Sequence, residues 1–193
     1  NVTLTGTVLM FIKGNKYLID NLFTSMILAF LIIAAIMGML FRNFLMIVIS
    51  LIPNVIPLVI TAGIMGYFGI PLKPSTALIF SIAFGISVDN SIHYLAKYRQ
   101  ELKTFKGNVS KAVTQSLKET GASMIYTSII LFFGFVIFTA SEFGGTIALG
   151  KLTSMTLLFA MMANLIVLPA LLLQFDSGKI NKDQPDLVDD YPE

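Results

Sequence analysis

Five stretches of this chain are long and apolar enough to cross a lipid bilayer as helices. Crossing the hydrocarbon core of about 30 Å takes about 20 apolar residues in a helix, and strands are rarely that long. Four stretches contain no charged residue, and the third contains one, Asp89. The sequence therefore predicts an all-α membrane protein, a bundle of about five transmembrane helices. The predicted helices cover residues 22–40, 44–68, 75–96, 122–140 and 152–175.

The composition agrees with a membrane protein. Of the 193 residues, 55% are hydrophobic and 12% are charged, whereas a soluble domain has about 25% charged residues. A soluble helical bundle would also need polar faces at a period of about 3.6 residues, and they are absent. The chain has no cysteine and one histidine, His93, so neither a disulfide nor a zinc site is expected. A net charge of +2 gives no indication of nucleic-acid binding, and neither a cofactor nor enzymatic chemistry is predicted.

Short polar segments flank the predicted transmembrane domain, residues 22–175. Residues 1–21 are interpreted as a short strand, Val2–Val8, leading into an interfacial stretch at the end of an extracytoplasmic domain. The chain begins at Asn1 rather than at a methionine, which suggests a piece of a longer protein, and no signal peptide is visible. The acidic segment 176–193 is expected to be a disordered cytoplasmic tail.

The basic residues predict the orientation, because cytoplasmic segments carry more Lys and Arg. Nine lie on the side that includes the long 97–120 segment, and four lie on the other side. The amino terminus is therefore expected outside and the carboxyl terminus inside the cell. The 97–120 segment should be partly helical, with Ala112, Val113 and Leu117 on a narrow apolar face. Its positive charge is interpreted as a signal that fixes the topology, which is favoured over a contact with anionic lipids. The nine are Arg42, Lys97, Arg99, Lys103, Lys106, Lys111, Lys118, Lys179 and Lys182, and the four are Lys13, Lys16, Lys73 and Lys151.

Asp89 is the residue most informative about function. An aspartate at the middle of a spanning helix costs about 2.5–3.5 kcal/mol on insertion scales, so it should face protein or water. Ser81, Gly85, Asp89 and His93 recur every four residues and form one stripe, whose small residues would allow close helix packing. Three further polar residues are expected to widen this face: Ser87, Asn90 and Ser91.

A rise of about 1.5 Å per residue places Thr127 and Ser128 of the following helix at the depth of Asp89. If the two helices are neighbours, one of these hydroxyls should meet the carboxylate. A carboxylic acid that alternates between enclosed and hydrated surroundings takes up and releases a proton, so Asp89 is a candidate proton carrier. The alternative is a simple hydrogen bond across a helix interface. His93, one turn away, fits either a proton relay or an ordinary boundary residue.

Two other helices contain residues that interrupt an apolar pattern. Pro53 and Pro57 flank Asn54 in the second helix; such a break can mark a hinge or cavity, although plain kinking is the favoured interpretation. Asn164 in the last helix is interpreted as a packing hydrogen bond rather than a site.

The segment FSIAFGISVDNSIHYLAKYRQEL, residues 80–102, resembles the motif G-x-x-x-D-x-x-I-H with Y-R-x-E of exporters in the resistance–nodulation–division (RND) superfamily. The similarity is greatest to its lipid- and hydrophobe-exporting branches, which include the mycobacterial large membrane proteins. The resemblance extends from Leu22 to Leu173, with matching pairs at Ala112–Val113, Thr120–Gly121 and Gly134–Phe135 and with Leu168-Pro169-Ala170.

The resemblance implies the last five helices of a twelve-helix transporter in the bacterial inner membrane. It implies a proton-relay role for Asp89, with Thr127 or Ser128 contributing from the next helix. Asn90 stands where several relatives have tyrosine or a second aspartate, which puts the strength of the coupling in doubt. The implied partners are the amino-terminal half of the same transporter, membrane lipids and a hydrophobic substrate, and self-association as a homo-oligomer is left open.

Three functions are compatible with these observations. The first is the carboxyl-terminal membrane portion of an exporter of lipids or other hydrophobic molecules, driven by the proton-motive force. The second is a sterol- or lipid-sensing membrane domain without transport. The third is an auxiliary subunit of protein export. A helical plan alone does not decide among them.

Overall fold

The computed structural model describes residues 7–41, 44–176 and 178, and nearly all of them are helical. The first three helices are long: α1 spans Thr7–Phe41, α2 spans Phe44–Tyr67 and α3 spans Pro74–Thr104. α4 covers Val109–Val136 and ends in a 3-10 turn, η1, at Ile137–Ala140. The last helix begins as α5, Gly144–Met162, passes through a π-helical turn, η2, at Ala163–Val167, and ends as α6, Leu168–Phe175.

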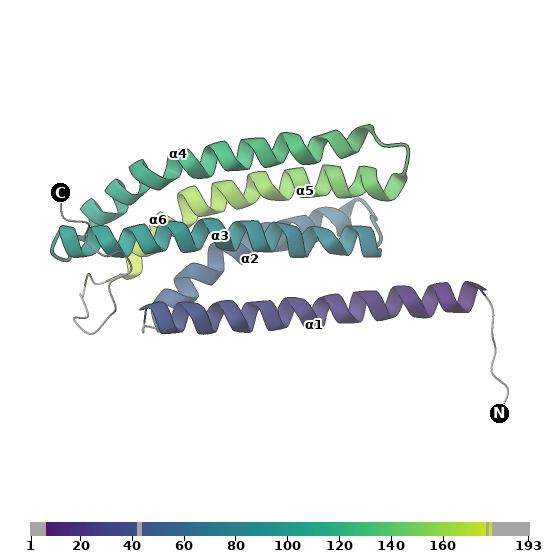
Figure 1. Ribbon diagram of the computed structural model, residues 1–193, viewed down its shortest axis with the longest axis horizontal. Helices are drawn as coiled ribbons and strands as arrows, with labels where there is room; N and C mark the ends of the chain where they lie inside the picture. The colour runs from purple at the N-terminus through teal and green to yellow at the C-terminus, as the bar shows by residue number, and fades with distance from the viewer. Residues whose placement is uncertain (1–6, 42–43, 177, 179–193) are drawn as a thin grey trace, which may run out of the picture.

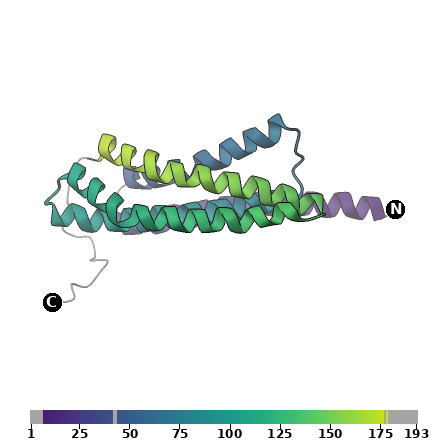
Figure 2. The same cartoon turned by 90° about the horizontal axis from the view of Figure 1, so that it is seen from above.

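Five helices within the described residues are long and apolar enough to cross a membrane, which confirms the predicted fold class. α3, α4 and α5 pack side by side as the centre of the bundle, and α2 crosses them obliquely (Figures 1 and 2). α1 lies at the edge, and only 6% of its most apolar stretch is buried, compared with 50% for α3. α3 is therefore the helix around which the described chain is built.

The helices are longer than the predicted spans. The fifth span was expected from residue 152, but α5 already begins at Gly144 and includes the exposed Lys151. Hydropathy marks the part of a helix that matches the hydrocarbon core, whereas backbone hydrogen bonding continues through polar residues beyond it. Most of the predicted strand Val2–Val8 lies outside the described residues. Its last two residues, Thr7 and Val8, are helical rather than extended, because the hydrogen bonding of α1 continues beyond its apolar span. The predicted acidic tail also falls almost wholly outside them.

The segment between the third and fourth spans forms a helical hairpin. α3 continues to Thr104, and α4 resumes at Val109 after a short turn in which Lys106 and Gly107 have positive φ angles of 52° and 87°. The Asn108 side chain caps α4 by accepting a hydrogen bond from the Lys111 backbone N–H at 3.1 Å. Ala112 and Val113 are buried, as expected for the predicted apolar face.

Among the described residues, the basic residues predicted on the cytoplasmic side lie on the α3–α4 hairpin, and the others lie on α1, just before α3 and on α5. The α3–α4 turn and the end of α6 lie at one end, and the α2–α3 and α4–α5 connections lie at the other (Figure 1). The hairpin extends past the end of α1 (Figure 1). At about 1.5 Å per residue, the 31 residues of α3 span about 46 Å, which exceeds the hydrocarbon core of about 30 Å.

Candidate functional site

Asp89 lies at the middle of α3 and faces out of the described bundle. Its side chain is 71% exposed, and that of His93 is 74% exposed. The Asp89 Oδ1 and His93 Nε2 atoms are 3.5 Å apart, one helical turn from each other. Among the described residues, His93 is the only polar partner of Asp89. The pair places a carboxylate beside an imidazole ring, whose two nitrogens can donate or accept hydrogen bonds.

The stripe that carries this pair is open along its length. Ser81 and Gly85 are exposed, and a Cβ added to Gly85 would meet no atom within 4 Å. The close helix packing predicted for these two residues is therefore not made by the described residues. The whole stripe from Ser81 to His93 is available to a partner surface, which we call the acid face of α3.

The structure does not bring the predicted hydroxyls to the acid. Thr127 is exposed, and its hydroxyl donates to the Ser123 carbonyl of its own helix at 2.9 Å. Ser128 is buried, with 3% of its surface exposed. Neither hydrogen-bonds to Asp89 among the described residues. Hydroxyls at the same depth on a neighbouring helix do not by themselves reach the carboxylate, because α3 turns the carboxylate away from the other described helices.

The opposite side of α3 carries a buried polar cluster. Ser87 and Ser91 are each 1% exposed, and they meet Asn54 of α2 and Asn164 of η2, which are 1% and 0% exposed. The Ser87 hydroxyl donates to Asn54 Oδ1 at 2.6 Å, and Ser91 Oγ lies 2.7 Å from Asn164 Oδ1 and 3.1 Å from Asn54 Oδ1. We call these four residues the amide–serine cluster.

Both asparagines use their amide nitrogens as well. Asn54 Nδ2 donates to the Ser50 carbonyl at 2.7 Å, one turn back in α2. Asn164 Nδ2 donates to the carbonyl and to the hydroxyl of Ser87, at 3.0 Å and 3.1 Å. Buried polar groups are stabilising only when they are paired in this way, so the cluster joins three helices at one point.

The cluster corrects the sequence-based assignment of the polar face. Ser87, Asn90 and Ser91 were expected to widen the face of Asp89, but all three are buried. The signal was in the spacing, because two serines four residues apart lie opposite the residue midway between them in an α-helix. Asn164 was interpreted as a packing residue, and its interhelical hydrogen bonds agree with that interpretation.

The two asparagines sit at irregular parts of their helices. Asn54 lies between Pro53 and Pro57 inside α2, and a proline has no N–H for the carbonyl four residues earlier. Asn164 lies in the π-helical turn that precedes Pro169. Prolines and π turns in membrane helices free backbone groups and allow bending. α2 bends visibly along its length (Figure 1), as plain kinking predicts.

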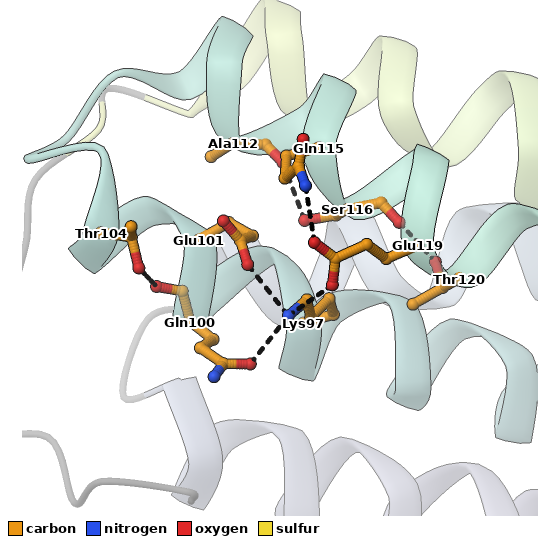
Figure 3. Close-up of polar contacts among 9 residues, drawn as sticks. All are labelled: Lys97, Gln100, Glu101, Thr104, Ala112, Gln115, Ser116, Glu119 and Thr120. Atoms are coloured by element: carbon orange, nitrogen blue, oxygen red, sulfur yellow. Dashed lines mark hydrogen bonds and ion pairs between the residues drawn. The ribbon is translucent and has the colours of Figure 1, made fainter. Parts of the chain in front are cut away.

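A charged cluster ties the two arms of the hairpin together. Lys97 Nζ of α3 lies 2.9 Å from Glu101 Oε1 on its own helix and 2.6 Å from Glu119 Oε2 on α4 (Figure 3). Gln115 Nε2 donates to the other Glu119 oxygen at 2.6 Å. Because these carboxylates are engaged at the end of the bundle, they are structural rather than candidate proton carriers.

Two buried tyrosines anchor α3 at the same end. The Tyr98 hydroxyl donates to the Asp176 carboxylate, directly after α6. The Tyr94 hydroxyl lies 3.4 Å from the Val113 carbonyl of α4. These contacts hold the hairpin and the end of α6 as one packed unit.

The described residues contain no group of three His, Asp or Glu side chains that could hold a metal ion.

Five helices long and apolar enough to cross a membrane, counted within the described residues, define a multi-pass membrane protein, and the middle of α3 carries an acid–histidine pair. The sequence profile of the MMPL family matches residues 1–181. The chain belongs to the MMPL family, which confirms the resemblance to the large membrane protein branch of the RND superfamily and supports a transporter-like role.

A related membrane protein of Methanocaldococcus jannaschii is 32% identical over 134 residues. The aligned region is 69% of this chain and 34% of that protein. The chain therefore spans about a third of the length of this relative.

Proposed function

We propose that this chain is the carboxyl-terminal membrane portion of a transporter that uses the proton-motive force to export lipids or other hydrophobic molecules. The observation that carries the proposal is the Asp89–His93 pair on an open face at the middle of a spanning helix. Family membership supports transport, and the mid-helix acid supports protons as the driving ion.

The open acid face is explained by a partner within the same transporter. An ionised aspartate facing lipid would cost at least about 2.5–3.5 kcal/mol, so this face should be covered by protein or lined with water. We infer that helices elsewhere in the full polypeptide cover Ser81, Gly85 and Asp89. The small residues Ser81 and Gly85 would then make the close packing that the described chain leaves unmade.

Proton coupling follows from the chemistry of the pair. A proton entering from outside binds the Asp89 carboxylate and removes its charge, and the neutral acid favours enclosed surroundings. Its release toward the cytoplasm restores the charge and favours hydrated surroundings. One charge crossing 100 mV supplies about 2.3 kcal/mol, which can drive the conformational cycle. His93 lies one turn closer to the hairpin, and in this proposal it passes the proton on.

The test is Asp89→Asn in the full-length protein, which keeps the shape of the side chain and removes its titration. Export of a hydrophobic substrate should collapse while the amount of inserted protein stays normal. Asp20→Asn makes the same chemical change on the exposed surface of α1 and should leave export unchanged. Export by Asp89→Asn at the wild-type rate would refute the proton-carrier role.

One observation favours a second function, lipid sensing without transport. The outer face of α2 has an apolar groove of about 430 Å³, a size that suits part of an acyl chain or a small sterol. A sensing domain should bind such a ligand equally well in wild type and Asp89→Asn, with or without a membrane potential. The groove is lined by Val48, Leu51, Ile52, Val55, Ile56, Val59 and Ile60.

A further inference from the structure

The amide–serine cluster and Asp89 lie at opposite poles of the same turn of α3. Each residue of an α-helix advances about 100° around the axis, so Ser87 and Ser91 each lie about 200° from Asp89. The two serines therefore lie within about 40° of each other, and Asp89 points the other way. The burial agrees: each serine is 1% exposed, and the Asp89 side chain is 71% exposed.

The cluster fixes α3 from two sides at once. Asn54 Oδ1 is within hydrogen-bonding distance of both serine hydroxyls, at 2.6 Å and 3.1 Å. Asn164 also bridges the pair, since its oxygen meets Ser91 Oγ at 2.7 Å and its nitrogen meets the Ser87 carbonyl at 3.0 Å. Each amide thus spans the same helical turn, and rotation of α3 about its axis would break bonds to both asparagines.

The bonds come from the parts of α2 and of the last helix that bend most easily. Asn54 lies between two prolines and Asn164 lies in a π-helical turn. Movement at either irregular segment would be transmitted to α3 through short serine side chains, which have little freedom to absorb it. The orientation of the acid is therefore linked to the two bent helices rather than to its own side chain.

We propose that Asn54 and Asn164, through Ser87 and Ser91, are positioning residues that set the rotation of α3 and so direct Asp89 toward its partner surface. The proposal rests on the proposed function, in which Asp89 carries the proton. It goes further by assigning a role to four neutral residues that do not touch the proton. Loss of the cluster should change the surroundings of Asp89, and not only the stability of the bundle.

The chain offers a matched control at another helix contact. Thr61 of α2 and Thr156 of α5 form a buried hydroxyl pair at 2.6 Å, which joins these two helices without contacting α3 through a hydrogen bond. The double variant Thr61→Val and Thr156→Val removes an interhelical hydrogen bond of similar burial. It should lower stability without turning Asp89.

The readout is the rate at which a hydrophobic carbodiimide modifies Asp89 in the full-length protein in membranes, measured across pH. The reagent adds to the protonated carboxyl group, so the rate reports both protonation and access. Asp89→Asn supplies the background rate. Asn54→Leu and Asn164→Leu should change the labelling rate by about fivefold, the factor given by one ordinary hydrogen bond, or shift the pH midpoint of labelling. Ser91→Ala is a milder variant, and it should change the same quantity in the same direction as the two leucine variants.

The outcomes separate the two proposals. Unchanged labelling profiles in Asn54→Leu, Asn164→Leu and Ser91→Ala, with only a lower melting temperature, would show that the cluster is merely structural. An equal change in the Thr61/Thr156 control would overturn the positioning role too. If Asp89→Asn still exports while the cluster variants alter labelling, the proton-carrier function fails and the positioning role stands.

Discussion

Gly150 illustrates how closely the helices of this protein approach one another. A Cβ at this position would lie 2.8 Å from the Phe135 carbonyl oxygen and 2.9 Å from the Phe138 Cβ. Those atoms belong to the end of α4 and to η1. Such contacts through glycine replace the hydrophobic driving force that lipid-embedded helices lack between them.

We therefore expect Gly150→Ala to destabilise the full-length protein by about 1–3 kcal/mol, the usual cost of overpacking. Gly121 is the matched control, because it is also buried but its added Cβ would meet no atom closer than 3.4 Å. Gly121→Ala should be neutral or stabilising by up to about 1 kcal/mol, from helix propensity. Thermal unfolding in detergent measures both, and equal melting temperatures would contradict the packing described here.

The important polar residues of α3 could be recognised in the sequence, but the face of the helix on which each of them lies could not always be predicted. Asp89 could be recognised because charge is rare at the middle of an apolar helix. Ser87 and Ser91 were placed on the wrong side, because polarity alone does not say which partner a side chain meets. Their asparagine partners are 33 to 77 residues away in the chain, so no local pattern joins them.

At the scale of elements, the α3–α4 hairpin is held by the residues that follow α6. The Tyr98 ring is buried in the core, and its hydroxyl donates to the Asp176 carboxylate. The sequence predicted helical character in this segment from its apolar face. It did not predict that α3 runs unbroken to Thr104, because Lys97 and Arg99 resemble the end of a membrane span in a hydropathy scan.

Tyr98→Phe tests this anchor, since it removes the hydroxyl and keeps the ring. We expect a loss of about 1.5–3 kcal/mol, as for other hydrogen bonds to charged groups. Tyr94→Phe should cost less, because its hydroxyl is 3.4 Å from the Val113 carbonyl. Chemical unfolding of the two variants in the full-length protein gives the comparison, and a larger loss for Tyr94→Phe would contradict the assignment.

At the scale of the whole molecule, the fold class was predictable because bilayer thickness restricts an apolar chain to helices of a certain length. The packing of the helices against one another could not be predicted from hydropathy. α1 is as apolar as α2, yet 6% of the most apolar stretch of α1 is buried, compared with 44% of that of α2. Hydropathy does not distinguish a neighbouring helix from lipid, since both are apolar.

The proposed orientation can be tested with single cysteines, since this chain has none. Lys106 lies in the exposed hairpin turn, and Glu142 lies in the exposed α4–α5 connection at the other end. After replacement of any cysteine elsewhere in the polypeptide, an impermeant maleimide should label Glu142→Cys in intact cells. Lys106→Cys should react only in inverted vesicles, and the reverse pattern would mean the opposite orientation.

The spacing Ser-x-Asp-x-Ser within α3 also restricts how the gene can change. Inserting or deleting one residue between Ser87 and Asp89 would rotate Asp89 and Ser91 together by about 100° relative to Ser87, so the two serines would no longer share one face of α3. Loops commonly accept such length changes, whereas here a single codon gained or lost would aim the acid at the wrong neighbours. We expect insertions and deletions between relatives to fall outside this turn, and the intact spacing to identify the same arrangement in distant sequences.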